Sequence, residues 1–126
     1  MSPSIIEKLA AARQALPAMS PEEAAKLLGR QDGLFVDVRD GDEVAKSGKV
    51  AGALNVSRGM LEFRADPASP AFNDAFAKDK TIVLYCASGG RSALAGQTLR
   101  DLGYDKVRNL GGFKDWADKG LPTEKA

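Results

Sequence analysis

The sequence Thr-Ile-Val-Leu-Tyr-Cys-Ala-Ser-Gly-Gly-Arg-Ser, at residues 81–92, is the most informative stretch for the fold class. Its first five residues are β-branched, aliphatic or aromatic, which is typical of a buried strand. Small residues and two glycines follow, and residues 92–102 then have the apolar spacing of a helix that Gly103 ends. A strand, a glycine-containing loop and a helix in this order indicate an α/β protein. The loop then lies at the carboxyl end of a strand, where parallel sheets hold their ligand sites.

Strand and helix patterns also alternate along the rest of the chain. Short apolar runs predict strands over residues 34–38, 53–56 and 106–110. Helical spacing predicts helices over residues 4–16 and 113–119, and Ser20-Pro21-Glu22-Glu23 has the form of a capping box that begins another helix. We therefore expect an α/β fold with a mostly parallel central sheet flanked by helices on both faces.

The composition fits one ordinary globular domain. The 126 residues are 44% hydrophobic and 28% charged, and this length suits a single domain. We expect a helical extension over residues 1–17, followed by the domain over residues 18–126. The extension packs against its own domain or offers a docking or dimer surface.

Charge and residue usage exclude several classes of function. The 18 basic and 17 acidic residues leave a net charge of +1, so we expect neither nucleic acid nor a membrane as a partner. No apolar run is long enough to span a bilayer and the N-terminus has no signal-peptide core, so the expected location is cytoplasmic. The chain has one cysteine and no histidine. The absence of histidine excludes Cys-His and Ser-His-Asp nucleophile pairs and argues against a zinc site; we expect no metal and no cofactor.

The loop over residues 86–92 combines a nucleophile with groups that stabilise negative charge. Two glycines and small residues allow the backbone to form a cradle of inward-pointing N–H groups, and the positive end of the following helix faces the same space. Arg91 adds a permanent charge and a planar fork for an oxyanion. These features are expected to lower the pKa of Cys86 without histidine. Taken singly, the residues also fit an inert buried cysteine, a simple turn and a surface arginine; their coincidence favours a functional site.

The loop and three other blocks together resemble the rhodanese family. The blocks are Cys-Ala-Ser-Gly-Gly-Arg-Ser at residues 86–92, Asp-Val-Arg followed by Glu43 at residues 37–43, Gly-Lys-Val-Ala-Gly-Ala-Leu-Asn at residues 48–55, and Asn-Leu-Gly-Gly-Phe with Trp116 and Pro122 from residue 109. They occur in the order typical of that family and cover roughly residues 18–124. Lys49, Ala51 and Val44 depart from the histidine, proline and aromatic residue that the family usually has there.

The resemblance implies a rhodanese-like fold and a sulfurtransferase. Cys86 would take the outer sulfur of thiosulfate or another small anionic donor and pass it to cyanide or a thiol, with a protein as a further possible acceptor. The substrate-binding residues would be Ala87, Ser88, Gly89, Gly90, Arg91 and Ser92. A non-enzymatic sulfur-relay or partner-binding module is the alternative. A phosphatase or arsenate reductase is disfavoured, because tyrosine-phosphatase loops place five residues between cysteine and arginine and this loop has four.

Four further charged residues lie near the expected site. Asp37 either braces the catalytic loop or satisfies its own turn. Arg39 and Glu43 are four residues apart and are expected to form a structural ion pair that supports the site. Arg58 emerges at the same sheet edge as Cys86 and attracts an anionic donor, or it is an exposed arginine without a role. It is also placed to pair with Glu62 if that segment is helical.

Overall fold

The computed structural model describes residues 4–126, so the first three residues of the expected extension lie outside it. The helices are α1 (Ile5–Ala15), α2 (Pro21–Ala25), α3 (Gly41–Ser47), the 3-10 turn η1 (Arg58–Met60), α4 (Leu61–Ala65), α5 (Gly90–Asp101) and α6 (Phe113–Asp118). The strands are β1 (Gly33–Asp37), β2 (Lys49–Val50), β3 (Leu54–Asn55), β4 (Thr81–Cys86), β5 (Val107–Gly112) and β6 (Thr123–Glu124).

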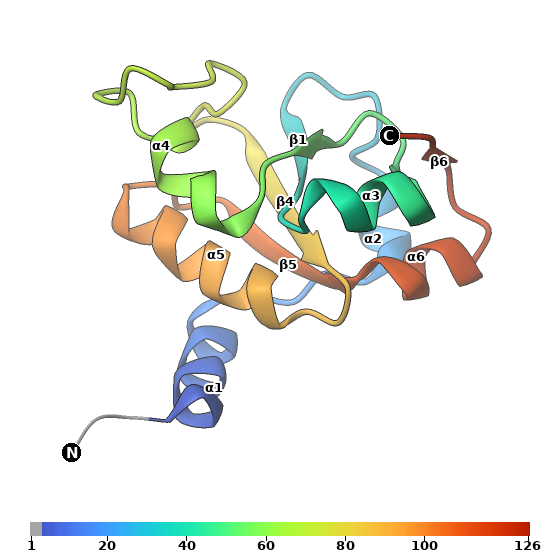
Figure 1. Cartoon of the computed structure of the whole chain (residues 1–126), viewed down its shortest axis with the longest axis horizontal. Coiled ribbons are helices and arrows are strands. Elements are labelled where there is room, and N and C mark those ends of the chain that lie inside the picture. The colour runs from blue at the N-terminus through green and yellow to red at the C-terminus, as the bar shows by residue number, and fades with distance from the viewer. Residues whose placement is uncertain (1–3) are drawn as a thin grey trace.

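Four parallel strands form the central sheet in the order β3-β1-β4-β5. The strand that precedes the glycine-containing loop, β4, therefore lies inside the sheet, with β1 on one side and β5 on the other (Figure 1). The strands β2 and β6 pair separately and antiparallel. The predicted α/β fold with a mostly parallel sheet is confirmed.

Alternate residues of β4 belong to two different cores. Ile82 and Leu84 lie in a cluster with Leu61 of α4 and Leu99 of α5. Val83 and Tyr85 lie in a second cluster, whose members include Ala24 of α2 and Trp116 of α6. Because side chains alternate across a strand, α4 and α5 cover one face of the sheet and α2 and α6 cover the other (Figure 1).

The N-terminal helix α1 packs on α5. Ser4 caps it, since the Ser4 hydroxyl accepts a hydrogen bond from Glu7 N at 3.2 Å. Ala12 and Leu16 are buried. Leu16 occupies the space above Gly96 of α5, where an added Cβ would lie 2.1 Å from Leu16 Cδ2. Figure 1 shows α1 beneath α5, on the opposite side from α4.

Two capping boxes begin the short helices. The predicted box at α2 is confirmed, because Glu23 N donates to Ser20 Oγ and Ser20 N donates to Glu23 Oε1, both at 3.1 Å. In α3, a helix that was not predicted from the sequence, Asp40 N donates to Glu43 Oε2 at 3.1 Å. Asp40 followed three residues later by Glu43 has the capping-box pattern, and this pattern could have predicted the start of α3.

Candidate active site

The loop between β4 and α5 is held against the end of β5. An irregularity in β5 places Gly111 opposite Tyr85 and Gly112 opposite Cys86. A Cβ at Gly112 would lie 2.7 Å from Ala87 O, and a Cβ at Gly89 would lie 3.3 Å from Gly111 Cα. Gly89 also has φ +100°, in the left-handed region. Glycines on both sides therefore allow the loop to pass this close to β5.

Cys86 lies at the bottom of this loop, where hydrogen-bond donors surround its sulfur. The residue is 1% exposed. Gly89 N donates to Cys86 Sγ at 3.0 Å, and the Ser92 hydroxyl lies 3.6 Å from the same sulfur. Burial raises the pKa of the thiol, but the amides of Ser92, Ser88 and Gly89 and the Ser92 hydroxyl together bring the pKa below its ordinary value. The cradle thus favours the thiolate, which is the reactive form.

Asn109 on β5 holds the loop from outside, a role that was not predicted from the sequence. Its Oδ1 accepts from Gly111 N at 3.0 Å and from Ser92 Oγ at 2.8 Å, and its Nδ2 donates to Gly89 O at 3.4 Å. Ser92 Oγ also lies 3.1 Å from Gly89 O. The single Ser92 hydroxyl proton therefore has three acceptors within reach: Cys86 Sγ, Gly89 O and Asn109 Oδ1.

Arg91 forms a bidentate ion pair with Glu43 of α3. Arg91 Nη1 lies 2.6 Å from Glu43 Oε2, and Arg91 Nη2 lies 2.8 Å from Glu43 Oε1. The Arg91 guanidinium, together with the Asp40 amide, lowers the pKa of Glu43 to about 2. The fork that we expected to face an oxyanion is occupied by a carboxylate, and the pair ties the loop over residues 86–92 to α3.

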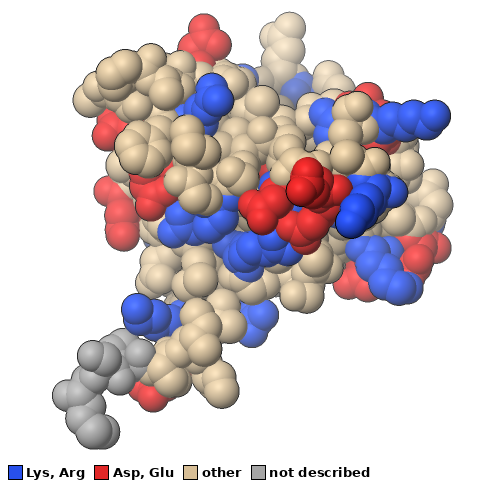
Figure 2. Space-filling model, in the orientation of Figure 1, with Lys and Arg blue, Asp and Glu red and all other residues tan. Residues whose placement is uncertain are grey.

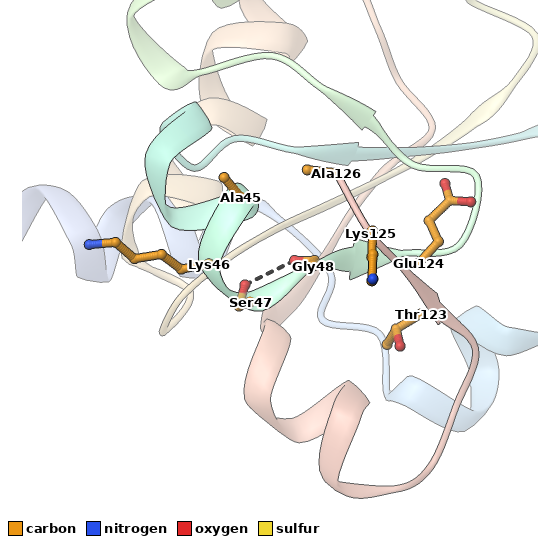
Figure 3. A pocket seen from close by; sticks show the side chains of 8 residues that line it. All are labelled: Ala45, Lys46, Ser47, Gly48, Thr123, Glu124, Lys125 and Ala126. Carbon is orange, nitrogen blue, oxygen red and sulfur yellow. Dashed lines mark hydrogen bonds between the residues drawn. The ribbon is translucent and has the colours of Figure 1, made fainter.

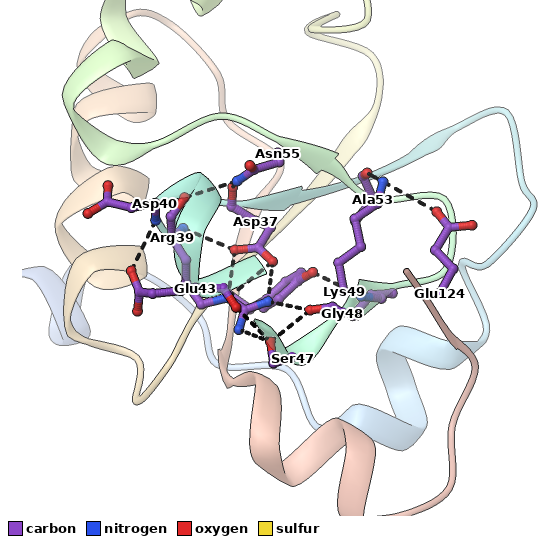
Figure 4. Close-up of polar contacts among 12 residues, drawn as sticks. Asp37, Arg39, Asp40, Glu43, Ser47, Gly48, Lys49, Ala53, Asn55 and Glu124 are labelled. Carbon is purple, nitrogen blue, oxygen red and sulfur yellow. Dashed lines mark hydrogen bonds and ion pairs between the residues drawn. The ribbon is translucent and has the colours of Figure 1, made fainter. Parts of the chain in front are cut away.

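The expected ion pair between Arg39 and Glu43 is wrong, because Arg39 binds Asp37 instead. Arg39 Nη2 lies 2.7 Å from Asp37 Oδ2, and Arg39 N donates to Asp37 Oδ1 at 3.0 Å (Figure 4). Arg39 also donates to Ser47 Oγ and Gly48 O, at 2.7 and 2.8 Å. The buried Asp37 carboxylate therefore satisfies its own turn and joins it to the end of α3, which is the second of the two roles considered for it.

Lys49 stands at the position where the rhodanese family usually has histidine, and its side chain contacts Ala53 and Glu124. Its ammonium group donates to Ala53 O and lies 3.3 Å from Glu124 Oε1 (Figure 4). Glu124 also accepts from Gly52 N at 2.8 Å. The lysine thus connects the turn between β2 and β3 with β6, and none of these contacts involves the loop over residues 86–92.

Arg58 contacts α5 and not the loop over residues 86–92. Its Nη1 lies 3.0 Å from Glu62 Oε1, which confirms the predicted pair, and its Nη2 donates to Thr98 Oγ1 at 2.8 Å. Thr98 is about two turns along α5 from Gly90. Arg58 lines a cleft of about 530 Å³ between α1 and α5, together with Lys8 and Gln97.

A large cleft lies away from Cys86. It has a volume of about 710 Å³ and lies between the end of α3 and the C-terminal segment (Figure 3). Its residues are Ala45, Lys46, Ser47, Gly48, Thr123, Glu124, Lys125 and Ala126. Two smaller clefts border the loop: one of about 330 Å³ at Ala87 and Phe113, and one of about 260 Å³ at Ser88 and Gly89.

Acidic and basic side chains are interspersed over the face of the molecule shown in Figure 2. Within residues 4–126, no group of three histidine, cysteine, aspartate or glutamate side chains is arranged to hold a metal ion. In that same part of the chain, every helix is too short or too polar to cross a bilayer.

Several known proteins are similar to this chain in sequence or in structure. The family described as "Rhodanese-like domain" matches residues 20–119. A sulfurtransferase of Allochromatium vinosum is 36% identical over 98 residues, which cover 77% of this chain and 83% of that protein. The human thiosulfate:glutathione sulfurtransferase is 32% identical over 110 residues, covering 82% and 95%. A Rhodopseudomonas palustris structure, described as a protein of unknown function and possible tyrosine phosphatase, has a TM-score of 0.90 at 39% identity and covers 98% of this chain and 96% of that one.

Proposed function

The chain belongs to the rhodanese-like family of sulfurtransferases, and from this premise we propose that it moves a sulfane sulfur from thiosulfate or a related small anion to a thiol or cyanide. The observation that carries this proposal is the donor cradle around Cys86 Sγ. A thiolate stabilised by amides and a hydroxyl is a ready nucleophile at neutral pH without an imidazole base.

In the first step, the Cys86 thiolate attacks the outer sulfur of thiosulfate. A bond forms between the two sulfur atoms, the S–S bond of thiosulfate breaks, and its electron pair leaves with sulfite. The cysteine is then a persulfide. In the second step a nucleophile, cyanide or a thiolate, attacks the outer sulfur, and the electron pair of the broken bond returns to Cys86 Sγ.

We assign the stabilisation of charge in both steps to the loop amides and not to Arg91. Gly89 N already donates to the sulfur, and preorganised N–H groups lose no reorganisation energy during the reaction. Arg91 is held by Glu43. In this mechanism it fixes the shape of the loop, and Asn109 fixes the same loop from the side of β5.

A phosphatase is the rival, because one similar structure is described as a possible tyrosine phosphatase. Two features weigh against it. Only four residues separate Cys86 from Arg91, and the arginine fork that a phosphate would need is bound to Glu43. We therefore expect thiosulfate to be turned over and p-nitrophenyl phosphate and arsenate to remain untouched.

Intact-mass measurement tests the proposal directly. Incubation with thiosulfate should add the mass of one sulfur atom, and cyanide should remove it. Because Cys86 is the only cysteine, Cys86→Ser should abolish both the adduct and thiocyanate formation. A Cys86→Ser protein that still forms thiocyanate would refute the persulfide mechanism. A stable persulfide that no small nucleophile removes would instead favour the relay module, with a protein as the acceptor.

A further inference from the structure

The helix α1 lies outside the residues that match the family, 20–119, yet it forms one wall of a cleft beside the catalytic loop. The cleft has a volume of about 260 Å³. Arg13 and Leu16 line it on the α1 side, and Ser88, Gly89, Asn109 and Gly111 are among the residues that line it on the side of the loop and β5. Gly89 is also the residue whose amide donates to Cys86 Sγ, so the cleft wall and the sulfur cradle share a residue.

This wall is fixed to the domain at several points. Met19 N donates to Asn109 O, and Asn109 N donates to Pro17 O, both at 3.0 Å. The segment after α1 thus adds a parallel bridge to β5 through Ala18. Leu16 is 3% exposed and fills the space over Gly96. Because Leu16 packs against α5, the backbone at Arg13, three residues earlier, is held at a fixed position relative to the domain.

Arg13 brings an uncompensated positive charge to the cleft. Among residues 4–126, no ion pair engages Arg13, whereas Arg39 and Arg91 pair with Asp37 and Glu43. No acidic residue lines the cleft. A negatively charged group is therefore attracted to the cleft, and no carboxylate of the protein competes for the site.

We propose that this cleft holds the carboxylate of a small thiol that accepts the sulfur from the Cys86 persulfide, an inference that rests on the proposed function. A volume of about 260 Å³ is far larger than the roughly 30 Å³ of one water in the liquid, so it admits an organic acid and not merely an inorganic oxyanion. With the carboxylate at Arg13, the acceptor thiolate attacks the outer sulfur. A new S–S bond forms on the acceptor, the bond to Cys86 breaks, and its electron pair stays on Cys86 Sγ.

The test uses the full-length protein, first loaded with thiosulfate and freed of excess donor. The rate of sulfur removal is measured by intact mass with 3-mercaptopropionate, which carries a carboxylate, and with the neutral 2-mercaptoethanol. We expect Arg13→Gln to lower the ratio of the two rates about two- to fivefold, as is typical of an exposed charge pair. Arg13→Lys should retain most of the ratio. Lys8→Gln is the matched control, since Lys8 lies on the same helix but lines the other cleft, with Arg58.

Three results would overturn the inference. The ratio in Arg13→Gln equals that of the wild type, or Lys8→Gln lowers it as much, or Arg13→Gln slows the loading step with thiosulfate and leaves the ratio unchanged. The last result would assign the cleft to the donor. A wild-type protein that never forms the persulfide would be recognised before any thiol is added, and it would refute the proposed function itself.

Discussion

At the scale of single residues, four donors act on one sulfur atom, and the proposed reactivity of Cys86 depends on them. Burial of Cys86 opposes ionisation, and the donors of the loop reverse that effect. Three of the four are backbone amides, which every substitution except that by proline retains. The fourth is the hydroxyl of Ser92, which lies between Cys86 Sγ and Asn109 Oδ1. It is the one donor that mutagenesis can delete while the amides remain in place.

Ser92→Ala is expected to raise the pKa of Cys86. The thiolate loses a donor, while the neutral thiol loses less, so the equilibrium moves toward the thiol. A net hydrogen bond of about 1 kcal/mol corresponds to roughly a fivefold change in an equilibrium constant, and the ionisation constant of the Cys86 thiol should fall by about that factor. Thiolate absorbance in the ultraviolet, followed against pH with Cys86→Ser as the blank, measures it.

Ser88→Ala is the matched control for that titration. Ser88 acts on the sulfur through its amide, which alanine retains, so its titration curve should coincide with that of the wild type. Both tyrosines, Tyr85 and Tyr104, have pKa values raised by burial, and tyrosinate absorbance therefore stays clear of the thiolate signal. If Ser92→Ala titrates like the wild type, the hydroxyl proton points to Asn109 or Gly89 O and not to the sulfur.

At the scale of elements, local sequence patterns predicted those parts of the fold whose residues follow one another along the chain. The strand β4, its loop and α5 follow one another, so spacing and glycine placement sufficed. The ion pair of Arg91 with Glu43 joins residues 48 positions apart, and the Asn109 contacts join β5 to the loop. Neither pair of partners can be predicted before the order of the strands in the sheet is known. The pair expected between Arg39 and Glu43 failed because the chain turns after β1. That turn brings Arg39 back onto Asp37, and α3 presents Glu43 to the loop.

Where α1 packs on α5, we expect the effect of Gly96→Ala on the free energy of unfolding to change sign with the residue at position 16. Gly96→Ala in the wild type forces Leu16 aside, because the new Cβ would lie 2.1 Å from Leu16 Cδ2. Overpacking of this kind costs about 1–3 kcal/mol of unfolding free energy. A Leu16→Ala background removes the three side-chain atoms that the new Cβ would meet first, and alanine exceeds glycine in helix propensity by about 1 kcal/mol. There the same substitution should stabilise the protein.

Denaturant unfolding of the four proteins in this cycle measures the coupling between residues 16 and 96. We expect Gly96→Ala to lower the free energy of unfolding in the wild type and to raise it in the Leu16→Ala protein, so that the two substitutions are not additive. Equal effects of Gly96→Ala in both backgrounds would mean that α1 is not held against α5 by Leu16. The proposed cleft at Arg13 would then lose its fixed wall as well.

At the scale of the whole molecule, one strand serves two cores. β4 gives Leu84 to the core with α4 and α5, and gives Tyr85 to the core with α2 and α6. Cys86 is the last residue of this strand and a member of the first core. A strand shared in this way cannot leave one core while it remains in the other, so the two faces of the sheet are expected to unfold as one cooperative unit.

Leu84→Ala tests this coupling. Leu84 is fully buried, and its truncation should lower the free energy of unfolding by about 2–5 kcal/mol. The only tryptophan, Trp116, lies in the opposite core, so its fluorescence reports on a region that the substitution does not touch. Far-ultraviolet circular dichroism reports on the helices, of which α5 is the longest described. Both transitions should move to the same lower denaturant concentration. A fluorescence transition that stays at its wild-type midpoint while the dichroism transition moves would show that the two cores unfold separately, and that a change on one face leaves the other folded.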